Sequence, residues 1–250
     1  MTVHFVGAGP GAADLITLRA AAMLAAADVV LYPGTYLDAE VLSHCRDGAR
    51  LVDTQDLDLD QIVDEVATAH GSGHDVVRLT SGDPSLYSAV AEQTRRLDEL
   101  GIGWDVTPGV AAYAAAAAAV GRELTVPLVT QSVVLTRAQA RSTAMPSTEA
   151  LANFAATRAT LALHLAITRT REVMAELSDG YGPDCPVVVV HRASQPEELV
   201  LRGTVGDISD QVEAAGLRQA AVILVGRALD PRSGGESYLY DPARDRTLKS

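Results

Sequence analysis

The sequence predicts an α/β protein that consists of two α/β domains, the first with a mainly parallel sheet and the second with a mixed sheet. Short β-branched runs alternate with helical patterns from the start of the chain, which is typical of a parallel sheet with right-handed crossovers. Glycine-rich loops follow several of these runs, at the position where open α/β sheets bind ligands. With 250 residues, of which 48% are hydrophobic, the chain is long enough for two domains of about 100–130 residues each, which we place at 1–120 and 121–250.

The first domain is expected to alternate between strands and helices along its whole length. Its first strand, 3–6, runs directly into the segment 7–11 (Gly-Ala-Gly-Pro-Gly), and Asp14 and Thr17 are candidate caps of the helix that follows. Apolar residues recur at helical spacing in 59–70, which predicts a helix with one face in the core. The expected strands are 3–6, 28–32, 50–52, 76–79 and 104–107, and the expected helices are 18–27, 38–45, 59–70 and 87–100.

The second domain is expected to begin after a passage at 121–124 that leads into a strand. One arm of an antiparallel hairpin is predicted at 198–203, and this arm makes the second sheet mixed. The segment 180–183 (Gly-Tyr-Gly-Pro) indicates a turn, and the tail from Asp230 is polar. The other expected strands are 133–136, 159–166, 186–191 and 221–226, and the expected helices are 149–156, 170–177 and 208–215.

The stretch 80–87 (Thr-Ser-Gly-Asp-Pro-Ser-Leu-Tyr) is the strongest candidate for a functional loop. It follows a short buried strand, and Gly82 permits a left-handed backbone or a close approach of other atoms. Asp83 adds a fixed carboxylate, and Pro84 stiffens the exit. Taken alone, the stretch is equally consistent with a plain turn between a strand and a helix. A ligand site is favoured because the same fold places the glycine-rich segment 7–11 beside it.

Composition argues against several classes of function. The formal net charge is −12 and the sequence pI is near 4.8, which disfavours binding to nucleic acid or to an anionic membrane through a basic face. The two cysteines, Cys45 and Cys185, indicate reduced thiols rather than a disulfide framework. The first residues lack the pattern of a signal peptide, and the apolar run 111–120 is too short to span a bilayer. We therefore expect a soluble, cytoplasmic protein.

The segment 7–11 does not fit the dinucleotide-binding fingerprint. That fingerprint needs Gly-x-Gly-x-x-Gly and an acid at the end of the second strand, but Gly11 comes one residue early and Pro33 stands at that strand end. Pro10 also removes an amide that a pyrophosphate would use. Neither a Walker lysine nor a Gly-x-Ser-x-Gly elbow is present. The six histidines and two cysteines share no close ligand spacing, so no metal site is predicted.

Three sets of residues together resemble one known family. They are 6–11 (Val-Gly-Ala-Gly-Pro-Gly) with Asp14, Leu15 and Thr17, then 82–84 (Gly-Asp-Pro), then 108–110 (Pro-Gly-Val). In order and spacing they resemble the tetrapyrrole (corrin/porphyrin) methylase family along nearly the whole chain. Further segments resemble the branch of this family that methylates carbon 11 of a corrin precursor in cobalamin biosynthesis. These segments are 32–35, 135–137 with Arg141, Pro146 and Glu149, 160–165, 186–198 and 203–204.

Two departures from the family's pattern concern Pro33. The segment 33–35 (Pro-Gly-Thr) stands where the carbon-11 enzymes typically have Ala-Gly-Ser. Pro33 also stands where the uroporphyrinogen-III methylases carry an Asp after the strand tyrosine. The second departure argues against the first-step enzyme, and the acid/base role proposed for that Asp is not carried over.

The resemblance implies S-adenosylmethionine as the cofactor and S-adenosylhomocysteine as its product. It also implies a class III methyltransferase-like fold, with the active site in the cleft between the two domains. The implied cofactor contacts are Pro10, Ser81, Gly82, Asp83, Leu86, Ala111, Ala112, Leu165, Ala193 and Thr204. Asp83 is the candidate partner of the methionyl amino group. For Leu86, Leu165 and the alanines, the alternative is plain core packing.

The implied substrate is a partly reduced tetrapyrrole, a precorrin, that is methylated on an electron-rich ring carbon. Such a carbon attacks by itself, so the protein's main task is positioning, and no catalytic residue is identified. Asp38, Asp53 and His164 are only candidates for a base. Arginine forks bind carboxylates well, so Arg137 and Arg141 are expected to hold the acetate and propionate groups, with surface solubility as the alternative.

Several alternatives stay open at this point. The substrate is either cobalt-free or the cobalt form of the same step, and another ring carbon is the next possibility. A binding module without turnover and a diphthine-type methylase of a protein residue share the fold, although the segment 137–149 favours the corrin branch. The resemblance also implies a homodimer.

Overall fold

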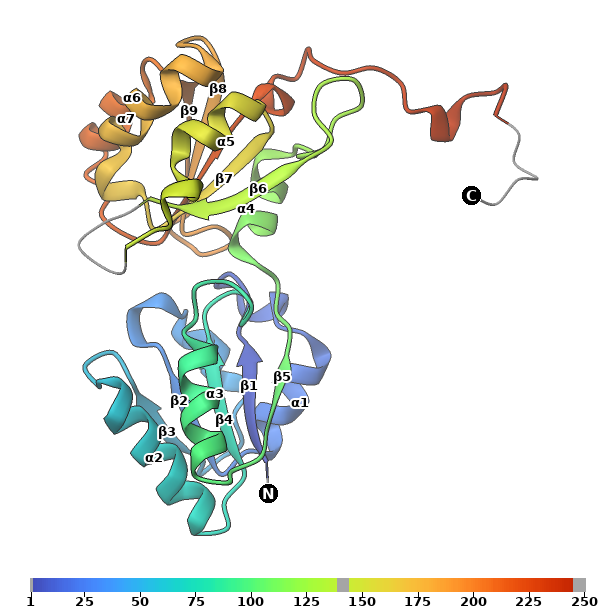
Figure 1. The fold of residues 1–250 in the computed structure, drawn as a ribbon. Coiled ribbons are helices and arrows are strands. Elements are labelled where there is room, and N and C mark those ends of the chain that lie inside the picture. Colours follow the sequence, from blue (N-terminus) through green and yellow to red (C-terminus); the bar gives the residue numbers. More distant parts are fainter. Residues whose placement is uncertain (1, 139–143, 245–250) are drawn as a thin grey trace. The chain divides into compact units, whose positions relative to one another are not determined.

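The computed structural model describes residues 2–138 and 144–244, and the chain divides into two compact units (Figure 1). Met1–Ala115 and Arg192–Glu198 form the first unit, and Ala116–His191 and Leu199–Ser250 form the second. The domain boundary expected after residue 120 stays a prediction. Within the described residues, no helix combines the length and the apolar character that crossing a membrane requires.

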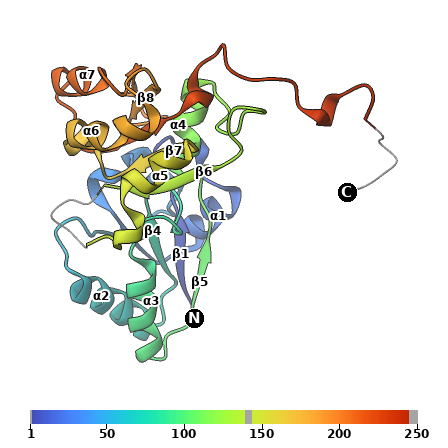
Figure 2. The same ribbon diagram turned by 45° about the horizontal axis from the view of Figure 1, so that its top comes forward.

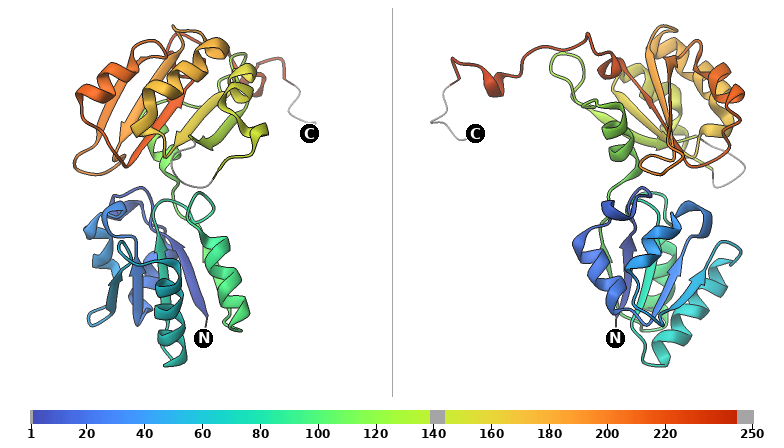
Figure 3. Two further views of the ribbon diagram at one scale, coloured as in Figure 1. Left: turned by 60° about the vertical axis from the view of Figure 1, so that its left-hand side comes forward. Right: turned by 180° about the vertical axis from the view of Figure 1, so that it is seen from behind.

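The first unit contains a parallel sheet that is covered by helices on both faces (Figure 3). Its elements are β1 (Val3–Gly7), α1 (Leu18–Ala26), β2 (Val29–Tyr32), β3 (Arg50–Asp53), α2 (Leu59–Gly71), β4 (Val76–Thr80), α3 (Val90–Glu99) and β5 (Trp104–Thr107). The five strands have the order β3-β2-β4-β1-β5. Val6, Val30 and Leu79 pack on the face that α1 covers, whereas Phe5 and Leu31 pack on the face that α2 and α3 cover. The interior strands are therefore apolar on both faces, as buried parallel strands are.

Local signals set where the first two helices begin. The side chain of Thr17 caps α1 by accepting a hydrogen bond from the backbone nitrogen of Ala20 at 3.1 Å. Asp58 and Gln61 form a capping box at the start of α2, in which each side chain accepts from the other residue's backbone nitrogen at 2.9 Å. Both helices begin at the residues that the sequence predicts.

The second unit contains a mixed sheet. The division between the units falls within α4 (Ala112–Val120). The elements that follow it in the second unit are β6 (Val133–Arg137), α5 (Leu151–Thr157), β7 (Thr160–His164), α6 (Thr170–Tyr181), β8 (Pro186–His191), β9 (Leu199–Thr204), α7 (Ile208–Ala214) and β10 (Ala221–Val225). The strand order is β6-β7-β10-β8-β9, in which only β6 and β7 run parallel to each other. Leu161, Leu163, Leu177 and Ile223 are fully buried in one apolar cluster that joins this sheet to α6. Two α/β units, one with a parallel sheet and one with a mixed sheet, confirm the predicted fold class.

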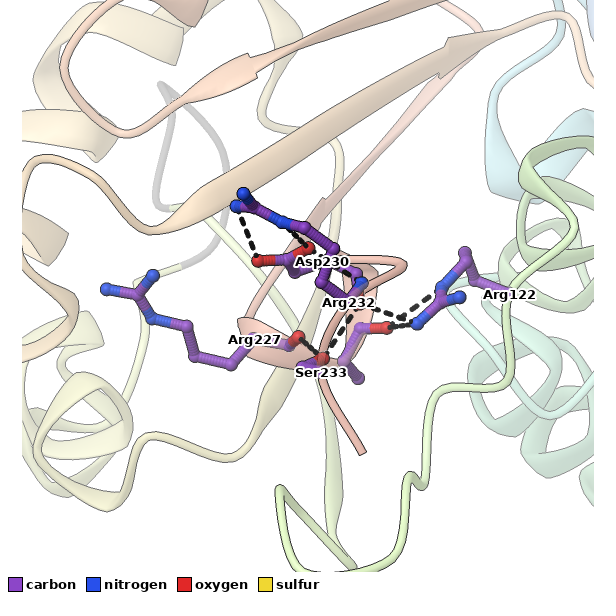
Figure 4. A network of polar contacts seen from close by, with 6 residues as sticks. Arg122, Arg227, Asp230, Arg232 and Ser233 are labelled. Carbon is purple, nitrogen blue, oxygen red and sulfur yellow. Dashed lines mark hydrogen bonds and ion pairs between the residues drawn. The ribbon is translucent and has the colours of Figure 1, made fainter. Parts of the chain in front are cut away.

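Arg122 fastens the segment after β10 to the residues that follow α4 (Figure 4). Its Nε and Nη2 donate to the carbonyl oxygen of Ala228 at 3.1 and 2.8 Å, and Nη2 also donates to the carbonyl oxygen of Asp230 at 2.8 Å. Ser233 Oγ donates to the carbonyl oxygens of Arg227 and Asp230 at 2.6 and 2.8 Å. The planar fork of the guanidinium thus binds two carbonyl groups at the end of a short helical turn, where backbone acceptors are available.

The helix expected at 87–100 begins later, at Val90. Tyr87 and Ala89 have φ angles of 54° and 53°, which lie in the left-handed region and cannot continue a right-handed helix. Residues 84–89 therefore form a non-helical connection between the candidate loop and α3.

One expected helix takes another form, and a turn stands where one strand is expected. The helix expected at 38–45 occurs as a 3-10 helix at Ala39–His44, a conformation common in such short pieces. The strand expected after the passage into the second domain does not occur in the described residues. Pro127 has no amide to donate to a ladder, and the nitrogen of Val129 instead closes a turn on the carbonyl oxygen of Val126 at 3.1 Å.

Candidate functional site

Three loops follow β4, β1 and β5, which are neighbours in the first sheet and end at the same edge (Figure 2). In chain order, the first loop is 8–12, which follows β1, the second is 81–89, which follows β4, and the third is 108–111, which follows β5. Two of them are joined through the backbone, because the nitrogen of Gly9 donates to the oxygen of Gly82 at 3.1 Å and the nitrogen of Gly82 donates to the oxygen of Gly9 at 2.8 Å. The structure thus places side by side the glycine loops that the sequence predicts to be neighbours.

Gly7 and Gly109 are required because backbones approach one another closely here. A Cβ on Gly7 would lie 2.5 Å from the nitrogen of Gly109, and a Cβ on Gly109 would lie 2.2 Å from the oxygen of Gly82. Gly82 itself differs, since its φ is +68° while a Cβ there would meet nothing closer than the nitrogen of Ala112 at 3.6 Å. Backbone conformation, and not lack of space, therefore requires glycine at 82.

Asp83 joins the second loop to the third. Its Oδ2 accepts a hydrogen bond from the nitrogen of Gly109 at 2.9 Å, and its Oδ1 accepts from the nitrogen of Ser85 at 2.9 Å and from Ser85 Oγ. Partial burial raises the pKa of this carboxyl, but the hydrogen bonds from Ser85 and Gly109 outweigh it, so the pKa lies below its ordinary value. Asp83 is therefore ionised at neutral pH. Its Oδ2 joins its loop to 108–111, and its Oδ1 braces its own loop.

A segment from late in the sequence, Arg192–Glu198, covers the first loop and belongs to the first unit. Gln195 Nε2 donates to the carbonyl oxygen of Pro10 at 3.1 Å, and the nitrogen of Ala12 donates to Ser194 Oγ at 3.1 Å. These partners are 185 and 182 residues apart in the sequence, so no local pattern pairs them. Gln195 and Ser194 are thus contributors to this site that short-range sequence signals do not reveal.

The predicted cofactor contacts fall into two groups. Eight of them belong to the first unit and are Pro10, Ser81, Gly82, Asp83, Leu86, Ala111, Ala112 and Ala193. Pro10 and Ala193 are buried, Ser81 is exposed, and Leu86, Ala111 and Ala112 are half-buried. The other two, Leu165 and Thr204, belong to the second unit. A joint site for the two groups, and the cleft expected to contain it, stay predictions.

The second sheet brings Arg137 next to His164 and separates Leu165 from Thr204. Arg137 and His164 are register partners at the carboxyl ends of the parallel strands β6 and β7. Leu165 comes directly after His164, with 61% of its surface exposed and a φ of 51°. Thr204 is paired with Pro186 at the opposite edge of the sheet, and its nitrogen donates to Asp207 Oδ1 at 2.7 Å. The predicted partner of Arg137, Arg141, lies outside the described residues.

Of the three candidate bases, two are engaged in local turns. Asp38 Oδ1 accepts from the nitrogen of Glu40, and Asp53 Oδ1 accepts from the nitrogen of Gln55, each at 2.9 Å. Burial lowers the pKa of His164, so this imidazole is neutral at pH 7.

We expect His164 to make stability depend on pH. Because its pKa in the folded protein lies below the value of about 6.5 in the unfolded chain, the unfolded chain takes up the proton first as pH falls. The free energy of unfolding should therefore decrease below about pH 6.5, and less so in His164→Gln. Urea unfolding at pH 7 and pH 5 measures this, with the exposed His74→Gln as the control. Equal pH dependence of His164→Gln and wild type would contradict the prediction.

Comparison with known proteins adds independent information. The family model of Tetrapyrrole (Corrin/Porphyrin) Methylases matches residues 2–209. A precorrin-4 C(11)-methyltransferase from Rhodococcus erythropolis is 53% identical over 247 residues, which cover 99% of each chain.

Two solved structures are also similar. The X-ray structure of a cobalamin biosynthetic enzyme, cobalt precorrin-4 methyltransferase, is 40% identical, has a TM-score of 0.89 and covers 92% of this chain and 96% of that one. A uroporphyrin-III C-methyltransferase from Thermus thermophilus, solved in complex with S-adenyl homocysteine, is 26% identical, with a TM-score of 0.76 and coverage of 92% and 94%. Since the family model matches residues 2–209 and a relative that is 53% identical covers 99% of the chain, the protein belongs to the tetrapyrrole (corrin/porphyrin) methylase family.

Proposed function

We propose that the protein is an S-adenosylmethionine-dependent methyltransferase that methylates C-11 of precorrin-4 to give precorrin-5 in cobalamin biosynthesis. The observation that carries this proposal is the convergence of three glycine loops at one edge of the first sheet, in a chain 53% identical to a precorrin-4 C(11)-methyltransferase. We further propose that it acts as a homodimer in the cytoplasm, with the tetrapyrrole as its only large ligand and without nucleic acid or membrane.

The loops of the first unit suit the cofactor chemically. Gly82 offers a bare backbone that faces the small residues Ala111 and Ala112, and such a wall accepts a flat adenine ring. The neighbouring Ser81 and Leu86 supply a hydroxyl and an apolar side chain. When bound, S-adenosylmethionine would supply an electrophilic methyl group on a sulfonium. The role of the loops is to bind and orient that cofactor, with Pro10, Asp83, Leu165, Ala193 and Thr204 as the other proposed contacts.

The protein's contribution to the reaction is mainly positioning. An electron-rich ring carbon needs no nucleophilic side chain, and holding it in line with the methyl group at near-attack distance supplies much of the rate enhancement. Arg137 stands at the carboxyl end of β6, and we propose that it and Arg141 bind the peripheral carboxylates of the substrate. Such guanidinium groups fix the position and orientation of a bulky macrocycle through its periphery and leave the reacting carbon free.

A second candidate is the cobalt form of the same step, because the 40% identical solved structure is that of a cobalt precorrin-4 methyltransferase. The 53% identity to the Rhodococcus enzyme favours the cobalt-free substrate. Another ring-carbon methylase of the family is the remaining alternative.

Incubation with precorrin-4 and S-adenosylmethionine carrying a labelled methyl group tests the proposal. We expect one labelled methyl per macrocycle by mass spectrometry and its position on C-11 by NMR. Cobalt-precorrin-4 run in parallel separates the two substrates, since the true substrate has the higher kcat/KM. Label on another carbon, or binding of S-adenosylhomocysteine without transfer to either macrocycle, would contradict the assignment.

A further inference from the structure

A buried arginine lies in β4, the strand that leads into the second loop. Arg78 stands in the middle of β4, between apolar residues, and only 7% of it is exposed. Its Nε donates to Gln93 Oε1 at 3.2 Å and its Nη1 donates to the carbonyl oxygen of Leu79 at 3.0 Å. Both acceptors are neutral oxygens, and burial lowers the pKa of Arg78 to about 10, so the guanidinium is still charged at neutral pH. A buried cation costs stability unless its donors are satisfied, which suggests a role beyond packing.

The arginine fixes the orientation of the Gln93 amide. Gln93 is 4% exposed and comes from α3. Because a guanidinium only donates, the amide oxygen must face Arg78, and the amide nitrogen must face the other way. There, Gln93 Nε2 donates to the carbonyl oxygens of Ala89 at 3.1 Å and Ser88 at 3.5 Å. A glutamate side chain at this position would accept from Arg78 but would have no N–H for either carbonyl. The carbonyl of Ala89 would keep the bond from the backbone nitrogen of residue 93, which is 3.3 Å long, and that of Ser88 would lose its bond.

The segment that Gln93 holds is the strained exit of the loop. Tyr87 and Ala89 both have left-handed backbones, which is unfavourable for residues other than glycine. Ala89 is also the N-cap of α3 and has no side chain that caps the helix. Strained conformations persist only where the surroundings hold them. In 84–89, the carbonyl oxygens of Ser88 and Ala89 accept from the side-chain amide of Gln93, which Arg78 orients.

We propose that Arg78 and Gln93 are positioning residues that act as a buried clamp, and that the clamp holds 84–89 in the conformation that lets the whole loop 81–89 bind the cofactor. The proposal rests on the proposed function, because Ser81, Gly82 and Leu86 are its cofactor contacts. It assigns a task to a charged residue that the sequence places inside an apolar strand.

The variant Gln93→Glu keeps the contact of residue 93 with Arg78 and removes the side-chain hydrogen bonds to Ser88 and Ala89. It keeps an acceptor for Arg78, whose charge favours the ionised carboxylate, but places oxygen against the carbonyls of Ser88 and Ala89. We expect the backbone amides of 84–89 to exchange hydrogen several-fold faster in the ligand-free variant. The Kd for S-adenosylhomocysteine, measured by calorimetry, should rise on the order of tenfold.

Thr94→Val is the matched control. Thr94 is also buried in α3, with 6% exposed, but its Oγ1 donates to the carbonyl oxygen of Ala91 within the helix at 3.3 Å. We expect this variant to leave both the exchange at 84–89 and the Kd as in wild type, even where its melting temperature falls as far as that of Gln93→Glu. A rise in Kd that simply follows the loss of stability in both variants would overturn the proposal.

A double-mutant cycle tests whether Arg78 acts through Gln93. Gln93→Met removes both the acceptor for Arg78 and the donor to the carbonyls of Ser88 and Ala89, and it adds no buried charge. It therefore still tests the role of Gln93 if Gln93→Glu does not fold. If the two residues form one clamp, Arg78→Met added to Gln93→Met should raise the Kd no further, whereas independent effects would multiply. Unchanged exchange and Kd in Gln93→Met would overturn the clamp. Wild-type protein that binds no S-adenosylhomocysteine contradicts the proposed function and the cofactor part of the clamp, while the exchange rates still decide whether Gln93 holds 84–89.

Discussion

Replacement of Gly109 by alanine is expected to destabilise the protein by about 3 kcal/mol and to lower its unfolding midpoint by roughly 6–12 °C. The added Cβ would lie 2.2 Å from the oxygen of Gly82 and 2.9 Å from the Cα of Gly7. All the opposing atoms belong to the backbone, so no rotamer change relieves the contact, and the loops must separate. Separation would also stretch the hydrogen bond from the nitrogen of Gly109 to Asp83, so cofactor binding should weaken as well.

Gly103→Ala is the control for this prediction. It makes the same chemical change in the turn before β5, where a Cβ would meet nothing within 4 Å. We expect its free energy of unfolding to change by no more than about 0.5 kcal/mol, the range of ordinary surface substitutions. Its unfolding midpoint, measured by differential scanning calorimetry, should therefore stay close to that of wild type. Equal midpoints for the two variants would mean that the loops are not packed as described.

Replacement of Gly82 by valine is expected to abolish cofactor binding while the protein stays folded. Its φ of +68° makes a β-branched side chain unfavourable by about 1–3 kcal/mol, which a folded domain tolerates. The Cβ would point toward the nitrogen of Ala112 and the Cα of Ala111, at 3.6 and 4.0 Å. The methyl groups of valine would therefore occupy the space beside Ala111 and Ala112 in which we propose that the adenine ring lies. We expect the Kd for S-adenosylhomocysteine to rise at least about a hundredfold in calorimetry.

Gly101→Val isolates the effect of the backbone. Gly101 has the same φ of +68°, also lies in the first unit, and has open space around its Cβ position. Its valine variant should lose similar stability and bind S-adenosylhomocysteine like wild type. If Gly82→Val also binds normally, the loop is only a turn and the cofactor lies elsewhere.

The elements that could be predicted from the sequence are those that local chemistry specifies. Thr17 and the Asp58–Gln61 pair mark the starts of α1 and α2 through hydrogen bonds between residues that are only three positions apart. The valine run of β8 lies at the predicted 186–191. The left-handed backbone at Tyr87 and Ala89 has no such signal, since neither residue favours it. It is stabilised by the side chain of Gln93, four residues along the chain, whose amide is oriented by Arg78 from β4. That second contact joins a strand to a helix and has no local sequence signal.

The candidate site was predictable in part for the same reason. Glycines mark each loop, but the sequence cannot tell that Gly109 is there for space and Gly82 for conformation. Asp83 was expected to face the cofactor, yet its Oδ2 also binds the neighbouring loop through the nitrogen of Gly109, a role that depends on the close approach of strand ends. Gln195 could not be paired with Pro10 from spacing, because 185 residues separate them.

That last contact has a consequence for the order in which the protein is made. Pro10 leaves the ribosome early, whereas the glutamine that covers its carbonyl oxygen emerges only after most of the second sheet has been synthesised. The parallel sheet of the first unit has all of its own strands by residue 107 and can begin to fold during translation. The first loop nevertheless lacks its cover until Arg192–Glu198 has been synthesised. The nascent protein therefore acquires the sheet long before it acquires the complete surface that we propose for cofactor binding.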